Sequence, residues 1–481
     1  FLYFIAFQRK VLSVSHQTVS VLASEAFSHL VPRVNACHGM SVDASSDGRD
    51  PSVPSVPPPS VAAVDEVLAQ KAPLALTPCA VVDVSAMRHN IEQVAANLRP
   101  LNIQLRPHLK TVKSVKIARM LTGDPAGAPI TVSSLAEAEY FFKHGGYTDI
   151  LYAVAFAAPK ARFVKPLHDA GLRLKVVVEH PVAAAQLVAA CERFDVAVDV
   201  LIEIDCGDAR GGLSLVRDGG HTRLLAIARE LAQGGPRTTL VGVMTHGGHS
   251  YRSRTVAAIR AACEDERVAA VTAAEALRRA GHRITIVSAG STPTVVHFAK
   301  VDGLTELRAG VYVFHDLDQL GIGSCRSAQN IALSVLTTVI GHSTNGRVII
   351  DAGGLALSKD VSAAKHGAGM AAGYGWVVGH DDLCVAALSQ EHGQIDFKRG
   401  GGADDEKHAS LFKRLPIGSR VRILPNHACF TAAAYDGYVA VDPRAKTVEV
   451  WPRVNFWFDG NATGNPDRLR NIVGPPATSK L

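Results

Sequence analysis

This sequence has no cluster of basic residues interleaved with aromatic residues, and it has no long apolar run. The formal charge of +6 is spread along 481 residues, so we expect no nucleic-acid partner. No uncharged apolar run reaches the ~18–20 residues that a membrane-spanning helix needs, so we expect no membrane partner. The eight cysteines show no paired spacing, which is typical of a reduced intracellular protein and not of a disulfide scaffold.

Acidic residues are almost absent from the first 40 positions, where Glu25 is the only one, and the first methionine is Met40. Such a basic, serine-containing segment predicts an organellar transit peptide, with untranslated or wrongly assigned sequence as an equal alternative. The proline-rich stretch DPSVPSVPPPSVAAV (50–64) predicts a linker. We therefore expect residues 1–64 to be a disordered extension. We expect a cytoplasmic protein, or a mitochondrial or plastid one if the transit peptide is genuine.

Between residues 65 and 325 the sequence contains a regular alternation of short β-branched runs with amphipathic stretches that end in glycine. The runs are CAVVDV, IQLRPHL, PITVSS, DILYAV, LKVVVE, VDVLIEID, TLVGVMTH, RITIVSAG and GLTELRAG. About eight such units predict an α/β fold, a (β/α)8 barrel of the TIM type, rather than an open sheet.

Helical patterns become rare after about residue 325. The segments ALSVLTTVIGH, GRVIIDAGG, LCVAALSQEHG, SRVRILPNHACF, YDGYVAVD and KTVEVWPRVN are separated by turns. Residues 326–460 therefore predict a second, mostly antiparallel β domain, followed by a tail at 461–481. The acidic, glycine-rich RGGGADDEKH (399–408) predicts a surface loop.

One expected barrel strand carries a histidine and a lysine on the same side. Side chains alternate along a strand, so Arg106, His108 and Lys110 of LRPHLKTVKS (105–114) share a face. Partial burial and cationic neighbours at the carboxyl end of a barrel strand would lower the pKa of Lys110 and make it an amine nucleophile. A solvated lysine at a strand end is the alternative, and the spacing alone slightly favours it.

Three further segments place anion-binding groups after strands. SAGSTPT (288–294) predicts backbone N–H groups that can bind an anion. ELRAGVYVFHD (306–316) adds a glycine and a tyrosine, and IEIDCGDARGG (202–212) places Arg210 after another strand. Each feature alone has an ordinary structural explanation. Together they indicate a phosphorylated ligand, and the lysine beside them indicates an aldehyde.

The chain resembles a known family through an ordered set of motifs. These are TPCAVVD, RPHLKTVKS, SSLAEAEYFFKHGGYTDILYA, DCGDARGG, GVMTHGGHSY, GSTPT, ELRAGVYVFHD, QEHG and PNHACFTAA. In this order they resemble the eukaryotic D-serine dehydratases, fold-type III pyridoxal-phosphate enzymes related to D-threonine aldolase and alanine racemase. The resemblance runs from about residue 75 to 455.

The resemblance implies that pyridoxal 5′-phosphate bonds covalently to Lys110. The other cofactor contacts that it implies are His108, Arg210, Tyr251, Gly290, Ser291, Thr292, Gly310 and Tyr312. Arg210 would face the pyridine nitrogen and, as a permanently charged group, leave that nitrogen neutral and the ring a weaker electron sink. Tyr251 would orient the substrate or assist a proton transfer, with a structural hydrogen bond as an equal alternative.

The segment PNHACFT contains a histidine and a cysteine that predict a site for one metal ion, which would assist departure of the leaving group from the substrate. His427 and Cys429 are two positions apart on an expected strand, so both side chains would point to one side. Imidazole and thiolate suit Zn²⁺, and two protein ligands leave coordination positions open. A buried histidine beside a buried cysteine is the commoner explanation of this spacing alone. The resemblance implies that these two residues are the zinc ligands.

The activity that the resemblance implies is a lyase that converts D-serine to pyruvate and ammonia. Lys110 would remove the Cα proton, and Zn²⁺ would bind the β-hydroxyl as a Lewis acid. D-Threonine aldolase and D-threo-3-hydroxyaspartate dehydratase are alternatives within the superfamily. A non-catalytic pyridoxal-phosphate homeostasis protein is a weaker alternative, because that class lacks the second β domain. We expect a D-amino acid as substrate and, by analogy with two-domain relatives, a homodimer.

Overall fold

The computed structural model describes residues 61–367, 370, 373–398, 400 and 404–455. Most of the expected N-terminal extension and all of the expected tail at 461–481 lie outside these residues. Residues 61–64 are an exception, because they belong to helix α1 (Val61–Lys71) and not to a linker. Val64, Val67 and Leu68 of this helix are buried, which explains why residues 61–64 belong to a helix. No helix in the described part of the chain combines the length and apolarity needed to cross a bilayer.

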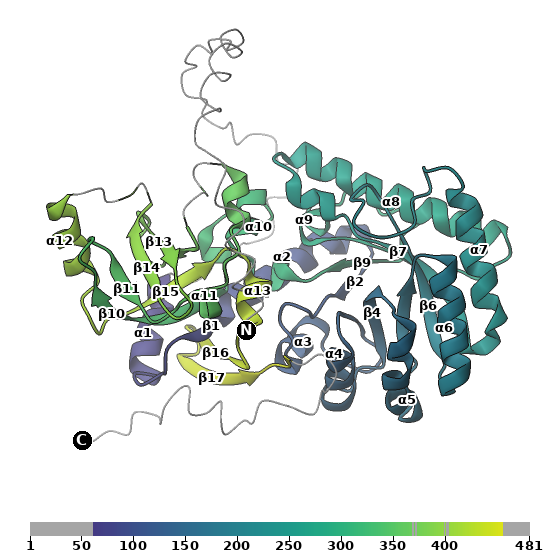
Figure 1. Ribbon diagram of the computed structural model, residues 1–481, viewed down its shortest axis with the longest axis horizontal. Coiled ribbons are helices and arrows are strands. Elements are labelled where there is room, and N and C mark those ends of the chain that lie inside the picture. The colour runs from purple at the N-terminus through teal and green to yellow at the C-terminus, as the bar shows by residue number, and fades with distance from the viewer. Residues whose placement is uncertain (1–60, 368–369, 371–372, 399, 401–403, 456–481) are drawn as a thin grey trace, which may run out of the picture. The chain divides into compact units, whose positions relative to one another are not determined.

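Eight parallel strands form a nearly closed barrel, which confirms the expected α/β fold (Figure 1). Their order in the sheet is β2-β9-β8-β7-β6-β5-β4-β3. Strands β2 and β3 come together through a bridge between His108 and Thr131, and the Leu109 N–H donates to the Thr131 carbonyl at 2.8 Å. The bounds are β2 Gln104–Pro107, β3 Pro129–Val132, β4 Asp149–Ala155, β5 Lys175–Val178, β6 Val198–Ile204, β7 Thr238–Thr245, β8 Ile286–Ala289 and β9 Glu306–Ala309.

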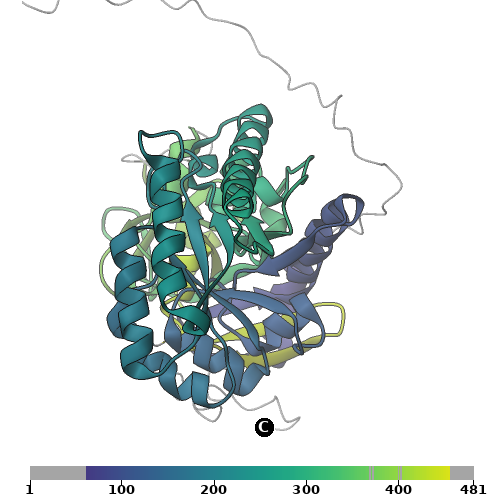
Figure 2. The same ribbon diagram turned by 90° about the vertical axis from the view of Figure 1, so that its right-hand side faces the viewer.

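Helices surround the barrel strands (Figure 2). They bury apolar faces at helical spacing, as Ala184, Leu187 and Cys191 of α6 do, and side chains such as Ser134 and Thr255 cap their first turns. The helices are α2 Val84–Leu98, α3 Val115–Thr122, α4 Leu135–Tyr140, α5 Ala161–Asp169, α6 Pro181–Phe194, α7 Gly220–Gln233, α8 Val256–Arg279 and α9 Thr292–Val295. Helix α10 (Leu317–Ile322) follows the barrel and packs through Leu317 against Ala363 and Leu424 of the C-terminal part of the chain.

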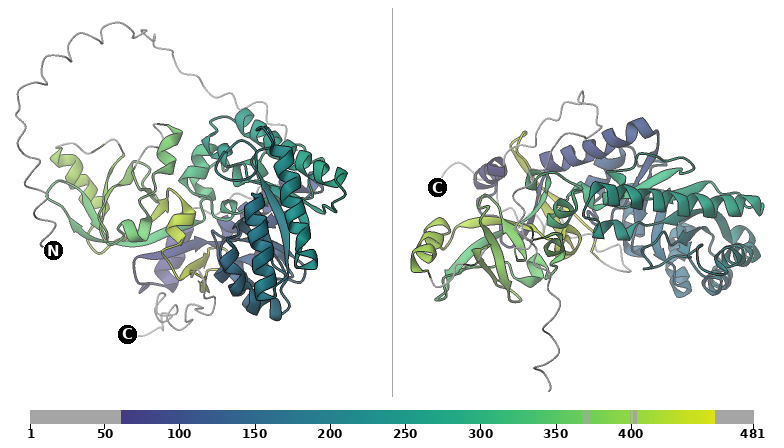
Figure 3. Two further views of the ribbon diagram at one scale, coloured as in Figure 1. Left: turned by 45° about the vertical axis from the view of Figure 1, so that its right-hand side comes forward. Right: turned by 90° about the horizontal axis from the view of Figure 1, so that it is seen from above.

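A second sheet of nine strands confirms the expected C-terminal β domain (Figure 3). Its order is β11-β14-β13-β12-β15-β10-β1-β16-β17, and every pairing is antiparallel except that of β1 with β16. The strands are β1 Cys79–Asp83, β10 Leu333–His342, β11 Val348–Ile350, β12 Gly375–Val377, β13 Leu383–Leu388, β14 Gly393–Phe397, β15 Arg420–Pro425, β16 Gly437–Asp442 and β17 Thr447–Pro452. Helices α11 (Gly354–Leu357), α12 (Asp405–Arg414) and α13 (Ala428–Ala432) accompany this sheet.

Two expectations about these elements are wrong. Strand β1 lies in the range 65–325 that we assigned to the barrel, but it pairs with β10 and β16 of the nine-stranded sheet. All five of its residues are buried, and such a pattern fits either sheet equally well. The expected loop at 399–408 contains the start of helix α12, because the Asp404 carboxylate accepts a hydrogen bond from the Lys407 N–H at 3.1 Å and caps the first turn.

Candidate active site

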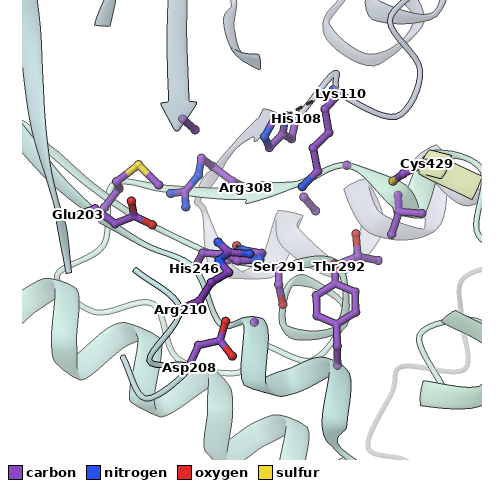
Figure 4. Close-up of a pocket in the computed structure, with 18 of the residues that line it drawn as sticks. His108, Lys110, Glu203, Asp208, Arg210, His246, Ser291, Thr292, Arg308 and Cys429 are labelled. Carbon is purple, nitrogen blue, oxygen red and sulfur yellow. Dashed lines mark hydrogen bonds between the residues drawn. The ribbon is translucent and has the colours of Figure 1, made fainter. Parts of the chain in front are cut away.

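Lys110 follows β2 and extends into a cavity of about 340 Å³ at the carboxyl ends of the barrel strands (Figure 4). A tight turn, in which the Lys113 N–H donates to the Leu109 carbonyl at 2.7 Å, ends the strand at this point. We expected Lys110 to be partly buried, but its side chain is exposed because it projects into the open cavity. The amine is therefore accessible to a ligand there.

Two histidines in the cavity are held in the neutral form. Burial, together with the charges of Lys110 and Arg308, lowers the pKa of His108 well below its usual value. Burial, Lys110 and Arg210 lower the pKa of His246 to about 3. His246 Nδ1 lies 3.2 Å from the Gly290 carbonyl, which only accepts hydrogen bonds, so Nδ1 carries the proton and Nε2 is left as an acceptor.

The expected anion-binding turn at Gly290–Thr292 lines the same cavity. Gly290 has φ +123°, and a Cβ there would lie 2.5 Å from the Arg308 carbonyl, so only glycine fits. The Gly290 N–H donates to Glu266 at 3.1 Å and the Ser291 N–H donates to Thr294 Oγ1 at 2.8 Å. Both of these backbone N–H groups are therefore used within the protein, in contrast to what we expected for an anion.

Gly310 completes this turn from β9. A Cβ at Gly310 would lie 2.6 Å from the His108 carbonyl, so a side chain would separate β9 from the lysine strand. Within the described part of the chain, the N–H groups of Gly310 and Val311 have no hydrogen-bond acceptor, and both residues line the cavity. These N–H groups, with the hydroxyls of Ser291 and Thr292, are a donor set that fits a phosphate group.

Two arginines reach the cavity in different environments. Arg210 lies in an exposed loop after β6 and makes no hydrogen bond or ion pair with another described residue. Arg308 is a buried residue of β9, and its Nη1 donates to Ser288 Oγ at 2.6 Å. In Figure 4, Arg308 and Glu203 lie on one side of the cavity, and Lys110 and Cys429 lie on the other. Arg308 is thus a second candidate, missed from the sequence, for the cationic partner of a ring nitrogen.

His427 and Cys429 do not lie on a strand. Strand β15 ends at Pro425, His427 is the N-terminal cap of helix α13, and Cys429 is the second residue of that helix. The structure nevertheless brings the pair to the lysine, because Cys429 Sγ lies 3.0 Å from Thr111 Oγ1, one residue after Lys110. His427 Nδ1 is 3.9 Å from Asp360 Oδ2.

The electrostatics of this pair favour a thiolate at Cys429 and a protonated His427, which would release its proton on binding a metal ion. Burial alone would raise the pKa of Cys429, but His427, Lys110 and the Thr111 hydroxyl outweigh it and lower that pKa below its usual value. Burial opposes protonation of His427, and the Cys429 thiolate, Asp316 and Asp360 nevertheless raise its pKa to about 9. No group of three or more His, Cys, Asp or Glu side chains within the described residues is arranged to hold a metal. The donor set is therefore imidazole plus thiolate, which fits Zn²⁺ with open coordination positions.

The two tyrosines expected at the site lie differently. Tyr251 lines the cavity with its ring 6.4 Å from the His246 ring, and burial raises the pKa of its hydroxyl. The Tyr312 side chain lines a second, mostly apolar cavity between α2 and β2. The backbone of Tyr312 contacts the anion turn, where its N–H donates to Thr292 Oγ1 at 3.3 Å.

Sequence reasoning missed several cavity residues. Glu203, His246 and Arg308 are polar residues at or near the ends of apolar strands, and that position is the one signal that could have identified them. Asp208 lies after β6, two residues before Arg210, and also lines the cavity.

Comparisons with known proteins identify the family of the chain. Residues 82–318 match the family profile "Alanine racemase, N-terminal domain", and residues 332–441 match "Putative serine dehydratase domain". The chain is 42% identical to the D-threo-3-hydroxyaspartate dehydratase of Delftia sp. (strain HT23), over 79% of this chain and 98% of that protein. It is 28% identical to the D-serine dehydratase of Dictyostelium discoideum, over 79% of this chain and 97% of that protein.

Solved structures extend the similarity. The structure of the Delftia enzyme superimposes with a TM-score of 0.74 at 41% identity, and covers 81% of this chain and 100% of that chain. A cysteine-to-alanine variant of the same enzyme, in a metal-free form, superimposes with a TM-score of 0.73 at 40% identity over 81% of this chain and 100% of that one. Pyridoxal phosphate is the cofactor that this fold type implies. The chain belongs to the D-serine dehydratase family of alanine racemase-like, fold-type III lyases.

Proposed function

We propose that this protein removes water from D-amino acids that carry a hydroxyl on Cβ, using pyridoxal phosphate and Zn²⁺, and releases a 2-oxo acid and ammonia. The observation that carries the proposal is the contact between Thr111 Oγ1 and Cys429 Sγ at 3.0 Å. It supports the proposal because the Cys429 sulfur lies next to the residue that follows the proposed reactive amine, in one cavity. A lysine and a metal pair so arranged can act on Cα and on the adjacent Cβ–OH of one small substrate.

The cavity residues fit pyridoxal phosphate. The donors at Gly310 and Val311 and the close approach allowed by Gly290 suit its phosphate, and Lys110 supplies the amine that bonds to its aldehyde. When bound, this cofactor supplies an electron sink for negative charge that develops at Cα. His108 and His246 are neutral and add no charge beside Lys110, so they do not repel a protonated lysine.

The proton movements can be assigned to side chains of the cavity. Lys110 Nζ accepts the Cα proton when its amine is free. Tyr251 keeps its proton because burial raises its pKa, so its hydroxyl can donate a hydrogen bond to the substrate. His427 and Cys429 would hold Zn²⁺, which supplies a Lewis acid for the β-hydroxyl.

Two substrates are candidates. The sequence motifs led us to expect D-serine, which gives pyruvate. The 42% identity over nearly the whole Delftia enzyme favours D-threo-3-hydroxyaspartate, which gives oxaloacetate. Arg210, exposed at the cavity and without a partner among the described residues, offers a cation to the second carboxylate of that substrate.

The test is product release by the full chain loaded with pyridoxal phosphate and zinc. We expect 2-oxo acid and ammonia from D-threo-3-hydroxyaspartate and D-serine, and loss of both products after treatment with a chelator. Formation of glycine and an aldehyde from D-threonine, without any 2-oxo acid, would assign the aldolase activity instead. Absence of all these products from the loaded protein would refute the proposal.

We also propose a homodimer. Phe430 and Leu355 are 57% and 59% exposed, and Phe430 packs against the ring of His427 at 4.6 Å between centroids. An exposed apolar ring next to a candidate metal ligand, together with a second exposed apolar side chain, is suited to burial against a second copy of the chain. Sedimentation equilibrium of the loaded protein measures the mass, and a monomer at micromolar concentration would refute this assembly.

A further inference from the structure

Glu266 is a fully buried carboxyl on helix α8, directly behind the anion turn. Its Oε1 accepts hydrogen bonds from two loops, one from the Gly290 N–H at 3.1 Å and one from the Gly247 N–H. Gly290 begins the anion turn after β8, and Gly247 follows His246 after β7. One carboxyl oxygen therefore joins the two loops that place the anion donors and the neutral histidine in the cavity.

The charges around Glu266 do not neutralise it. Arg308 on β9 is the cation that acts on it, but the guanidinium hydrogen-bonds to Ser288 and to the Thr245 carbonyl and forms no ion pair with Glu266 among the described residues. Cys263 on α8 and Cys206 after β6 are further titratable groups that interact with it, and burial keeps both as neutral thiols.

The second carboxyl oxygen favours a protonated state. Oε2 is buried and has no hydrogen-bond partner in the described structure, whereas the Thr294 hydroxyl faces this carboxyl from α9. With a proton on Oε2, Glu266 could donate a hydrogen bond toward Thr294, whose Oγ1 accepts a hydrogen bond from the Ser291 N–H. Burial raises the pKa of Glu266 to about 7, although the nearby Thr294 hydroxyl, the N–H groups of Gly247 and Gly290 and the charge of Arg308 oppose this rise.

We propose that Glu266 is a positioning residue that ties the Gly247 and Gly290 loops together, and that it carries a proton whenever a phosphate group occupies the anion turn. A phosphate at the anion turn and an ionised Glu266, which is buried and accepts a hydrogen bond from the Gly290 N–H of that turn, would be two negative charges close to each other. Like charges so placed favour the neutral acid. The inference rests on the proposed function, because it takes the phosphate of the cofactor as the anion.

The test compares cofactor affinity in two proteins across pH. Dissociation constants of pyridoxal phosphate are measured by absorbance on the cofactor-depleted full chain between pH 6.5 and 9, for the parent and for Glu266→Gln. Glutamine keeps a carbonyl for the two N–H groups and cannot ionise. We expect the dissociation constant of pyridoxal phosphate to rise for the parent relative to the variant, by up to about tenfold for each pH unit above ~7. The reason is that binding to the parent takes up one proton. The ionisations of the phosphate and of Lys110 are common to both proteins and cancel in the ratio.

Two comparisons separate this role from general structural support. Pyridoxal, which lacks the phosphate, should bind both proteins with the same pH dependence. Glu264→Gln, an exposed change on the same helix that removes an ion pair with Arg267, should behave like the parent. Equal pH dependence of pyridoxal phosphate binding in the parent and in Glu266→Gln would overturn the inference. A parent protein that binds no pyridoxal phosphate would instead refute the proposed function.

A second measurement covers the case in which Glu266→Gln does not fold. Calorimetry of the parent at pH 8, in buffers that differ in ionisation enthalpy, counts the protons taken up on binding. We expect pyridoxal phosphate to take up close to one proton more than pyridoxal does. An equal uptake for the two ligands would overturn the inference without any variant.

Discussion

Lys110 is the residue on which the proposed chemistry depends most directly, because it is the exposed amine at the centre of the cavity. Replacing Lys110 by alanine removes the group that bonds to the cofactor aldehyde and accepts the Cα proton. We expect loss of the borohydride-sensitive visible absorbance, and a fall in 2-oxo acid release of at least about 10³-fold. The measurements are the absorbance spectrum and the rate.

Lys116→Ala is the matched control for that change. Lys116 is an exposed lysine on the following helix, and its Nζ lies 3.3 Å from Glu449 Oε2. The variant should keep both the spectrum and the rate. If Lys110→Ala kept the visible band, the covalent role of this lysine would be wrong.

Cys429 is the second decisive residue, because its thiolate lies beside Thr111 and His427. Changing Cys429 to alanine leaves one protein ligand for the metal, so we expect the zinc content per chain to fall severalfold and the dehydration rate to fall with it. Elemental analysis of the dialysed protein measures the first effect. Cys384→Ala, a change of another cysteine in strand β13, should leave the zinc content unchanged. Full zinc occupancy in Cys429→Ala would contradict the assignment of this ligand.

At the scale of elements, the anion turn requires close contact between β9 and the segment after β2. Gly310→Ala would place a Cβ 2.6 Å from the His108 carbonyl, so the two segments must separate at the carboxyl end of the lysine strand. We expect the affinity for pyridoxal phosphate to fall by about tenfold or more, because a shift of a few tenths of an ångström displaces donors from the phosphate.

Gly341→Ala, a change in strand β10, is the control for Gly310→Ala. Its Cβ would meet Ile349 at 3.8 Å, which is an ordinary contact, so cofactor affinity should not change. Equal affinities for the parent and Gly310→Ala, measured by cofactor titration, would show that the contact between β9 and the lysine strand does not set the phosphate site.

The sequence allowed all eight barrel strands to be predicted, because short apolar runs alternate with helical patterns over this part of the chain. It did not allow the sheet of β1 to be predicted, since strand pairing depends on partners far along the chain. The metal pair was placed on a strand because local alternation continued past Pro425, where the backbone turns into α13. The short strands β12 and β14 and helix α12 were also missed.

Among the cavity residues, too, those marked by a local sequence pattern could be predicted and those defined by distant contacts could not. Lys110, Gly290 and Gly310 could be predicted because they stand at strand ends with distinctive neighbours. His246, Arg308 and Glu266 could not, because their importance comes from burial and from hydrogen bonds to other loops, which no local pattern records.

At the scale of the whole molecule, stability should depend on pH through buried neutral histidines. His315 is buried, and burial lowers its pKa to about 3, whereas an unfolded histidine takes up a proton below about pH 6.5. Between these values the unfolded state binds more protons than the folded state, so stability is lost as the pH falls. His315 should contribute a loss of about 1.4 kcal/mol for each pH unit below 6.5.

The comparison is between the parent and His315→Asn, since asparagine tolerates the left-handed φ of +50° at this position. Unfolding temperatures at pH 7, 6 and 5 should fall less steeply for the variant. Glu266 and Asp316 have raised pKa values and act in the opposite direction, but they are present in both proteins. His221→Asn, at an exposed position, should keep the slope of the parent. Parallel slopes for the parent and His315→Asn would contradict the assignment.

The nine-stranded sheet is built from two distant parts of the chain. Strand β1 lies between β10 and β16, so it connects the β16–β17 hairpin to the rest of the sheet. Helix α1 adds an ion pair, in which Asp65 Oδ1 lies 2.6 Å from Arg422 Nε. We expect residues 326–455 alone to show no cooperative thermal unfolding, and residues 61–83 joined to them by a glycine-serine linker to restore it. A sharp transition in the shorter fragment would contradict this dependence.

The position of β1 has a consequence during translation. This strand leaves the ribosome with the first part of the folded chain, but its partner β10 is synthesised roughly 250 residues later, which takes roughly 12–50 s at typical elongation rates. Throughout that interval five residues that are buried in the finished protein have no sheet to join. A nascent chain stalled before β10 should therefore contain an orphan strand, available to chaperones, beside a barrel whose eight strands are already complete.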